Sequence, residues 1–222
     1  MENLTLIIPA KNEKESLPVV LNELKKFNLK IIIILEKEDK DTIEAIKDYD
    51  CSILYQINKG YGDALIQGIN NVITKYFCIF NADGSFNPNE LENMLNQIKS
   101  KNLDLIFASR YEKDCSSEDD TIVTYLGNFF FTKIGKIFFN LNISDILYTF
   151  VIGKTIEVKN LELKKKDFVF CVELPIIAKK KKLSISTSKS HERARFAGTK
   201  KVNAIRDGFL ILAGMIKFFF LK

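Results

Sequence analysis

The sequence contains no tryptophan and only one histidine, and its four cysteines lie far apart. No two cysteines form a Cys-X-X-Cys motif, and one histidine does not suggest a zinc site. The cysteine spacing also lacks the density of the disulfide frameworks that hold small secreted domains together. The composition therefore argues against zinc-binding and disulfide-scaffold proteins and favours a reducing compartment.

Long hydrophobic runs are missing as well. The apolar stretch Leu4 to Pro9 is too short for a signal peptide, and polar residues follow at once at 11–13. Near the end of the chain, the uncharged run Gly208 to Ile216 is interrupted by Lys217, whereas a membrane-spanning helix needs about 20 apolar residues. We therefore expect a cytoplasmic protein with no membrane-spanning helix.

Positive charge is only slightly in excess, because 33 basic and 28 acidic side chains give a net charge of +5. The lysines nevertheless cluster, at 164–166, 179–182 and 200–201. Such clusters usually form solvated faces, and anionic lipid headgroups or nucleotide phosphates are the alternative partners. None of the common nucleic-acid-binding signatures appears, so nucleic acid is not an expected partner.

The sequence does contain a regular alternation of strand and helix patterns over its first 110 residues. Its composition, 46% hydrophobic and 27% charged over 222 residues, suits one globular domain. Five short apolar runs are typical of buried strands, at residues 4–8, 31–35, 52–55, 77–80 and 105–108. The alternation predicts an α/β fold with a mostly parallel sheet, whose ligands bind at the carboxyl ends of the strands.

Local signals mark where two of the intervening helices begin. Asn12 and Glu15 are spaced as a capping box for the first helix. Asn87 and Pro88 provide a cap and a first-turn proline for another.

Two helical patterns in the second half carry more apolar surface than one core face needs. One covers residues 121–139, and the other is a Phe-rich amphipathic helix that we place at residues 202–222, after a domain of residues 1–201. We expect these helices to lie in the membrane interface. Packing against the sheet, or a dimer contact in a homo-oligomer, is the alternative.

Asp83 raises a question of chemistry. It follows the apolar run 76–80 and is itself followed by Gly84, so it lies at the expected ligand-binding edge of the sheet. An Asp-Gly pair after a strand most often forms a turn, in which the aspartate bonds to its own backbone. From these residues alone, a turn and a metal site both remain open.

Four segments favour the metal site through their order and separation: Leu6–Glu13, Asn58–Ala64, Asn81–Ser85 and Ala108–Tyr111. Together they resemble family 2 glycosyltransferases of the GT-A fold, particularly the dolichyl- or polyprenyl-phosphate sugar synthases. The resemblance continues through 144–145, 170–173 and 191–212 and covers nearly the whole chain. It implies an inverting enzyme of glycan or cell-envelope biosynthesis, peripheral on the cytoplasmic membrane face. Such an enzyme moves a hexose from a GDP- or UDP-sugar to polyprenyl phosphate.

The resemblance also implies a donor site. Its nucleotide-sugar contacts would be Pro9, Ala10, Glu13, Glu36, Lys59, Asn81, Ala82, Asp83, Arg195 and Lys201. The family's Asp-X-Asp motif appears here as Asn81-Ala82-Asp83, and an amide oxygen can replace a carboxylate toward a hard cation. We therefore expect Mg²⁺ or Mn²⁺ to be held by Asp83 and Asn81. The cation, together with Arg195 and Lys201, would stabilise the leaving nucleoside diphosphate.

On the acceptor side, Arg110 matches the family's arginine near the acceptor phosphate, and Thr124 replaces a serine with the same role. Asp120 departs from the family, because relatives commonly have arginine there. A lipid monophosphate is largely dianionic at neutral pH and needs no general base, so His191 is expected to be structural. The catalytic set is then Asp83, Arg110 and Arg195. The alternatives are a transferase with a saccharide hydroxyl acceptor and a carboxylate base, and a nucleotide-binding protein that has lost catalysis.

Overall fold

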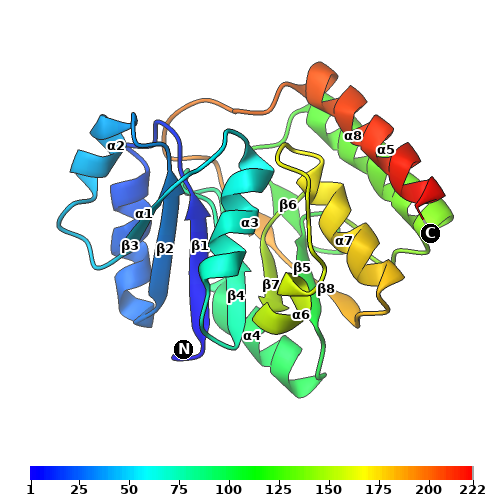
Figure 1. Ribbon diagram of the computed structural model, residues 1–222, viewed down its shortest axis with the longest axis horizontal. Helices are drawn as coiled ribbons and strands as arrows, with labels where there is room; N and C mark the ends of the chain where they lie inside the picture. Colours follow the sequence, from blue (N-terminus) through cyan, green and yellow to red (C-terminus); the bar gives the residue numbers. More distant parts are fainter. Residues whose placement is uncertain (222) are drawn as a thin grey trace.

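The computed structural model describes residues 1–221 as a central β-sheet with helices on both faces (Figure 1). The seven strands lie in the order β3-β2-β1-β4-β7-β5-β8, and β7 alone runs antiparallel to its neighbours among the described strands of this sheet. Their bounds are β1 Leu4–Pro9, β2 Lys30–Leu35, β3 Ser52–Tyr55, β4 Tyr76–Ile79, β5 Leu105–Ser109, β7 Val151–Lys154 and β8 Ile185–Lys189. A separate short pair joins β6 (Ser116–Ser117) to β9 (His191–Glu192). The predicted α/β fold with a mostly parallel sheet is confirmed.

The core lies on both faces of the sheet because its central strands are apolar on both sides. In β1, Ile7 packs into the cluster formed with α3 and α7, whereas Leu6 and Ile8 pack on the opposite side with α1 and α4. Ile7 is also in register with Ile32 of β2 and Ile79 of β4. Burial on both faces explains why β1, β4 and β5 read as continuous apolar runs. All five expected strands are confirmed, but the expected burial of β3 is wrong, because this strand lies at the edge of the sheet with Ser52 and Tyr55 exposed.

Eight α-helices and one 3₁₀ turn connect the described strands. Their bounds are α1 Leu17–Leu24, η1 Lys25–Phe27, α2 Lys40–Ala45, α3 Tyr61–Asn71, α4 Glu90–Ser100, α5 Ile122–Phe139, α6 Thr155–Lys159, α7 Phe170–Lys180 and α8 Ala204–Phe220.

The two expected helix starts need correction. The capping box at Asn12 is wrong: Asn12 adopts a left-handed conformation (φ 53°), and α1 begins five residues later, after Ser16. The Asn12 N–H instead bonds the Asp39 carboxylate at 2.7 Å. Likewise α4 begins at Glu90, because Asn87 and Pro88 form a preceding turn in which the Asn87 side chain accepts the Asn89 N–H at 3.0 Å.

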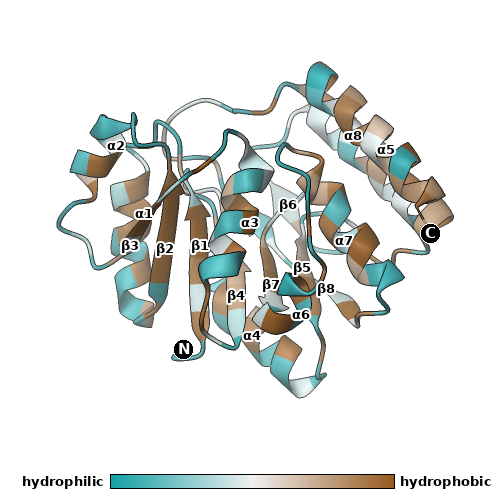
Figure 2. Ribbon diagram, in the orientation of Figure 1, coloured by the Kyte–Doolittle hydropathy of each residue, from teal (hydrophilic) through white to brown (hydrophobic). Residues whose placement is uncertain are grey.

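Helices α5 and α8 lie side by side at one end of the molecule (Figure 1). In Figure 2, hydrophobic residues (brown) recur along both helices. Exposed apolar side chains include Ile122, Val123, Leu126, Phe129, Phe130, Ile137, Phe138, Ile205, Phe209, Ile216, Phe219 and Phe220. Among residues 1–221, no helix is long and apolar enough to cross a membrane.

The opposite face of α8 is docked on the rest of the protein. Ile211, Met215 and Phe218 are buried in the core, and a Cβ at Gly214 would lie 2.4 Å from a methyl carbon of Val169, so the helix approaches closely. Core packing and an exposed apolar face therefore coexist in α8. The boundary at residue 202 stays a prediction, and Lys222, its last residue, lies outside the described residues.

Candidate active site

A cleft of about 570 Å³ opens at the carboxyl ends of β1, β4 and β5. Every site residue expected from the sequence lines it: Pro9, Ala10, Glu13, Glu36, Lys59, Asn81, Ala82, Asp83, Arg110, Thr124, Arg195 and Lys201. These residues come from segments almost 200 positions apart, so the fold, and not their proximity in sequence, gathers them. Their individual roles stay predictions.

The end of the cleft near β1 and β2 is fixed by a buried carboxylate. Glu13 accepts a hydrogen bond from the Ser16 hydroxyl at 2.6 Å, and its backbone N–H donates to the Thr42 hydroxyl at 3.0 Å. Burial raises the pKa of Glu13, although the Ser16 hydroxyl and Lys201 oppose that effect. Nearby, Glu36 is paired with Lys11 at 2.8 Å. This end therefore presents two carboxylates, which can accept hydrogen bonds from a polar ligand.

Asp83 follows β4 and is both a turn residue and a cleft residue. Its Oδ1 accepts the Ser85 N–H at 3.0 Å, as expected for an Asx turn, while Asn81 Nδ2 donates to the Ser85 hydroxyl at 3.2 Å. Gly84 has φ +85°, and a Cβ there would lie 2.3 Å from the Phe196 ring. The turn thus requires glycine for both its conformation and the close approach of residue 196.

These residues fit a hard divalent cation that is bound jointly with a substrate. Among residues 1–221, no group of three or more His, Cys, Asp or Glu side chains could enclose a metal by itself. Mg²⁺, however, is commonly held by one or two carboxylates plus substrate phosphates. The Asp83 carboxylate and the Asn81 amide oxygen, both lining the cleft, can provide such a partial shell.

The loop that follows β9 covers this region and has a fixed stem. Arg193 makes two bonds to the Glu23 carboxylate, at 3.0 and 2.9 Å, and a third to the Phe86 carbonyl at 2.8 Å. The Ala194 N–H donates to Glu118 at 3.2 Å. These contacts anchor the loop to helix α1, to the turn after β4 and to the segment before α5.

Residues 195–201, here called the basic tip, extend from that stem over the cleft. Arg195 Nε and Nη2 bond the two carboxylate oxygens of Asp119 at 3.0 and 2.9 Å, and Nη2 lies 3.6 Å from Asp83 Oδ2. Lys201 Nζ lies 3.6 Å from Glu13 Oε1. Gly198, within the tip, has φ +80°, a backbone conformation that favours glycine.

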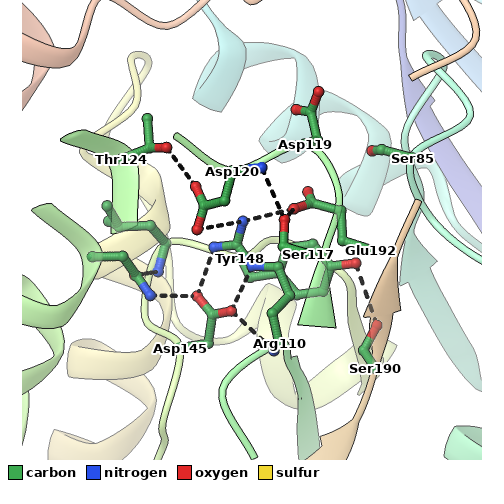
Figure 3. Close-up of polar contacts among 12 residues, drawn as sticks. Ser85, Arg110, Ser117, Asp119, Asp120, Thr124, Asp145, Tyr148, Ser190 and Glu192 are labelled. Carbon is green, nitrogen blue, oxygen red and sulfur yellow. Dashed lines mark hydrogen bonds and ion pairs between the residues drawn. The ribbon is translucent and has the colours of Figure 1, made fainter. Parts of the chain in front are cut away.

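At the other end of the cleft, Arg110 lies in a cluster of carboxylates (Figure 3). Its guanidinium makes a two-point contact with Asp145, at 2.7 and 3.0 Å, and its Nη1 bonds Glu192 at 2.9 Å. The Arg110 side chain is only 10% exposed and Asp145 is fully buried. Burial opposes the charged form, but the carboxylates outweigh it and raise the pKa of Arg110.

Asp120 lies beside this cluster and faces the cleft. Its carboxylate is 3.9 Å from Arg110 Nη1 and accepts hydrogen bonds from the Tyr111 hydroxyl and the Thr124 hydroxyl. The expected acceptor residue Thr124 therefore has a carboxylate as its partner. The Tyr148 ring packs against Arg110, with its centroid 4.5 Å from the guanidinium carbon.

Sequence reasoning missed several residues of this site. Asp119 gave no signal, since it is one of several acidic residues in an irregular segment. Glu192 lies within residues 191–212, which share the family resemblance, but it was not predicted as a site residue. Burial raises the pKa of Glu192. Asn128 sits in α5, where its Nδ2 donates to Asp145 at 2.8 Å. A polar residue in a predominantly apolar helix was the available signal.

Two residues that the resemblance covers have structural partners. Glu173 accepts the backbone N–H groups of Lys164 and Lys165, at 3.0 and 2.8 Å, and so fixes the loop before α7. The His191 N–H donates to Glu90 at 2.8 Å and its ring bonds Ser116 at 2.8 Å. These partners agree with the expectation that His191 is structural.

Comparison with known proteins identifies the family. Residues 5–155 match Glycosyl transferase family 2. The chain belongs to this family. It is a glycosyltransferase that takes its sugar from a nucleotide-sugar.

Curated relatives are distant. A UDP-N-acetylglucosamine–dolichyl-phosphate N-acetylglucosaminyltransferase from Methanococcus voltae is 26% identical over 205 residues, 81% of each chain. The low-salt glycan biosynthesis hexosyltransferase Agl6 of Haloferax volcanii is 22% identical over 148 residues, which cover 64% of this glycosyltransferase and 36% of that protein.

A solved structure shares the fold. The structure of glucosyl-3-phosphoglycerate synthase from Mycobacterium tuberculosis, in complex with Mn²⁺, UDP and glucosyl-3-phosphoglycerate, superposes with a TM-score of 0.78 at 12% identity. The match covers 99% of this glycosyltransferase and 81% of that chain. Identity this low shows the fold alone, so this likeness confirms the predicted GT-A architecture.

Proposed function

We propose that this glycosyltransferase moves a hexose, with inversion, from a UDP- or GDP-sugar to a polyprenyl or dolichyl phosphate at the cytoplasmic face of a membrane. One observation carries the proposal. The cleft that starts at the carboxyl edge of the sheet extends to the two apolar helices, where Thr124 and Asn128 of α5 and Ile211 of α8 line it. An acceptor with a polar head and an apolar tail fits this arrangement.

At the donor end, the nucleoside lies over the ends of β1 and β2, against Pro9, Glu13 and Glu36. A divalent cation held by Asp83 and Asn81 would supply neutralising charge to the diphosphate. Arg195 and Lys201 donate to the phosphate oxygens as the leaving group gains charge, which lowers the barrier in a partly enclosed site. Closure of the basic tip also excludes water that would otherwise hydrolyse the sugar.

At the acceptor end, a phosphate oxygen of the lipid is the nucleophile. It attacks the anomeric carbon from the side opposite the diphosphate, so the configuration at that carbon inverts. Because the phosphate is largely dianionic, no proton has to be removed. Arg110 and Thr124 orient the acceptor, and that role requires the phosphate to compete with the carboxylates that now surround the guanidinium.

The membrane part of the proposal is supported by the exposed surface of α5 and α8. Exposed apolar side chains line both helices, and the described residues of the two helices carry Lys133, Lys136, Arg206 and Lys217 against a single acidic residue, Asp207. A surface of this composition binds anionic bilayers through apolar burial and charge attraction. Thr124, on α5, would then place the reacting phosphate near the membrane surface.

The test is a panel of nucleotide-sugars offered with short-chain polyprenyl phosphate and Mg²⁺ or Mn²⁺. The proposal predicts one lipid-linked product, formed only when both a divalent cation and the phosphorylated lipid are present. Replacing the lipid phosphate by the corresponding polyprenol is the matched control. Transfer to the polyprenol, or to neither lipid, would overturn the acceptor assignment.

A second candidate, transfer to a saccharide hydroxyl, is favoured by the carboxylates beside Arg110. Asp120 faces the cleft, and burial raises the pKa of Glu192, so either could accept a hydroxyl proton. Asp120→Asn separates the two candidates. Removing a negative charge should lower the Michaelis constant for a phosphate acceptor, whereas it should nearly abolish transfer to a hydroxyl if Asp120 is the base.

A further inference from the structure

The cations of the basic tip are already paired with carboxylates. Asp119 is paired with two of them, Arg195 and Lys200. It makes the two-point contact with Arg195 described above, and Lys200 Nζ lies 3.3 Å from Asp119 Oδ2 and also bonds the Asp119 carbonyl. Lys201 is paired with Glu13 at 3.6 Å. Asp119 therefore holds two cations that line the cleft, and one of them, Arg195, is a proposed contact of the nucleoside diphosphate.

Asp119 belongs to a different part of the chain from the tip that it holds. It lies in the segment before α5, which is joined to the loop stem by the bond from the Glu118 N–H to the Glu192 carbonyl at 2.9 Å. Burial disfavours the ionised form of Asp119, but hydrogen bonds from Arg195 and the charges of Arg195 and Lys200 outweigh it and lower the pKa of Asp119. The carboxylate is therefore ionised at neutral pH.

A carboxylate and a phosphate accept the two N–H groups of a guanidinium in the same geometry. Asp119 and a donor diphosphate are thus competitors for Arg195. The competition has a second component, because Arg195 Nη2 also lies 3.6 Å from Asp83, the proposed cation ligand. A bound cation would repel the guanidinium from Asp83 and leave Asp119 as its main carboxylate partner.

We propose that Asp119 is a positioning residue that substitutes for the donor diphosphate. It holds Arg195 and Lys200 over the cleft in the nucleotide-free protein, releases them to the diphosphate when the donor binds, and recovers them when the nucleoside diphosphate leaves. Because each phosphate contact must replace an existing contact with Asp119, the exchange weakens nucleotide binding and speeds product release. The inference rests only on the donor half of the proposed function.

Asp119→Asn removes the charge and keeps the size of the side chain. Titration of the full chain with UDP and with GDP, each with Mn²⁺, should show about tenfold tighter binding of the cognate nucleotide in the variant, since one charge-assisted competitor is lost. The Michaelis constant for the donor should fall, and product release should slow. Glu118→Gln is the matched control: it removes the adjacent charge, whose carboxylate accepts the Ala194 N–H, and should leave binding unchanged.

A measurement without nucleotide gives an independent readout. Hydrogen exchange of the amides at residues 195–201 should be faster in Asp119→Asn than in the wild type or Glu118→Gln, because the tip loses its main restraint. Weaker or unchanged nucleotide binding in Asp119→Asn, or unchanged exchange of the tip, would overturn the inference. If the wild type binds neither UDP nor GDP, the donor half of the proposed function fails, and the inference fails with it.

Discussion

Arg110 and Arg195 lie at opposite ends of one cleft in very different surroundings. Arg110 follows β5, a fully buried strand, is 10% exposed and bonds a fully buried aspartate. Arg195 is 20% exposed and extends from a loop that contains a glycine with positive φ. Both make two-point contacts with a carboxylate, but the partner of Arg195 is 15% exposed and lies at the cleft wall. The chain thus contains one arginine that cannot move without disturbing the core and one that can.

This difference teaches that similar ion pairs can have different functions. A buried pair is costly to break because the remaining charge has no solvent. A pair at the cleft wall with no fully buried member leaves less uncompensated charge when it separates, so its guanidinium can exchange the carboxylate for another anion. We therefore expect Arg110 to be fixed in place before the acceptor arrives, and Arg195 to change partners during each catalytic cycle.

Asp83→Ala has the largest expected effect on activity. The Asp83 side chain lines the cleft and is not part of the hydrophobic core, so the variant should fold normally but lose divalent-cation-dependent sugar transfer. Turnover with Mn²⁺ and thermal unfolding would be measured on the same preparation. Asp114→Asn, at an exposed position outside the cleft lining, is the control, because asparagine tolerates the positive φ of 67° at this residue. Normal Mn²⁺-dependent turnover in Asp83→Ala would remove this residue from the proposed donor site.

Arg110→Ala should act first on stability. It leaves Asp145 buried without its cation, a loss that typically costs about 3–5 kcal/mol. Urea denaturation of the variant would measure the change in unfolding free energy. The double variant Arg110→Met with Asp145→Asn removes both charges and should recover part of it. An unchanged unfolding free energy in Arg110→Ala would contradict the distinction between the two arginines.

Arg195→Ala should leave the fold intact and act on the chemical step. Loss of a contact that strengthens as charge separates commonly costs about 3 kcal/mol, or roughly a hundredfold in turnover. Donor affinity should change less, because Asp119 already competes for this cation. Arg195→Lys keeps the charge but loses the two-point geometry, and should recover only part of the rate. Steady-state kinetics with saturating donor would check this, and a normal turnover number for Arg195→Ala would be inconsistent with the proposal.

The smallest expected effect is that of a substitution on the apolar face of α8, which should weaken membrane binding. Phe209 is 71% exposed, and inserting one such ring into a bilayer contributes about 2 kcal/mol. Phe209→Asp should therefore weaken sedimentation with anionic vesicles at least tenfold without lowering stability. Phe218→Ala, a buried position on the same helix, should instead lower stability. If wild-type protein stays in the supernatant at low salt, α5 and α8 meet another copy of the chain and not a membrane.

Features that depend on neighbouring residues could be predicted from the sequence, whereas features that depend on contacts between distant residues could not. Strands β1, β4 and β5 have apolar runs because they are buried on both faces, so the sequence identifies them without knowledge of the tertiary structure. Strand β3 was located as well, but its position at the exposed edge of the sheet could not be read from its residues. Strand β7 has a weaker signal, because only Val151 and Ile152 of its four residues are large and apolar, and no local feature indicates that it inserts antiparallel between β4 and β5. In the site, Asp83 and Arg195 could be located from ordered motifs. Asp119 and Glu192 could not, because their importance comes from contacts with residues about 75 or more positions away.

One measurement tests the account most directly: formation of a lipid-linked sugar from labelled UDP- and GDP-sugars, short-chain polyprenyl phosphate and Mn²⁺, with wild type and Asp120→Asn compared side by side. The account predicts a phosphodiester-linked product that requires the cation, together with a lower Michaelis constant for the lipid phosphate in Asp120→Asn, which carries one less negative charge beside Arg110. Transfer only to a saccharide hydroxyl, abolished by Asp120→Asn, would contradict it.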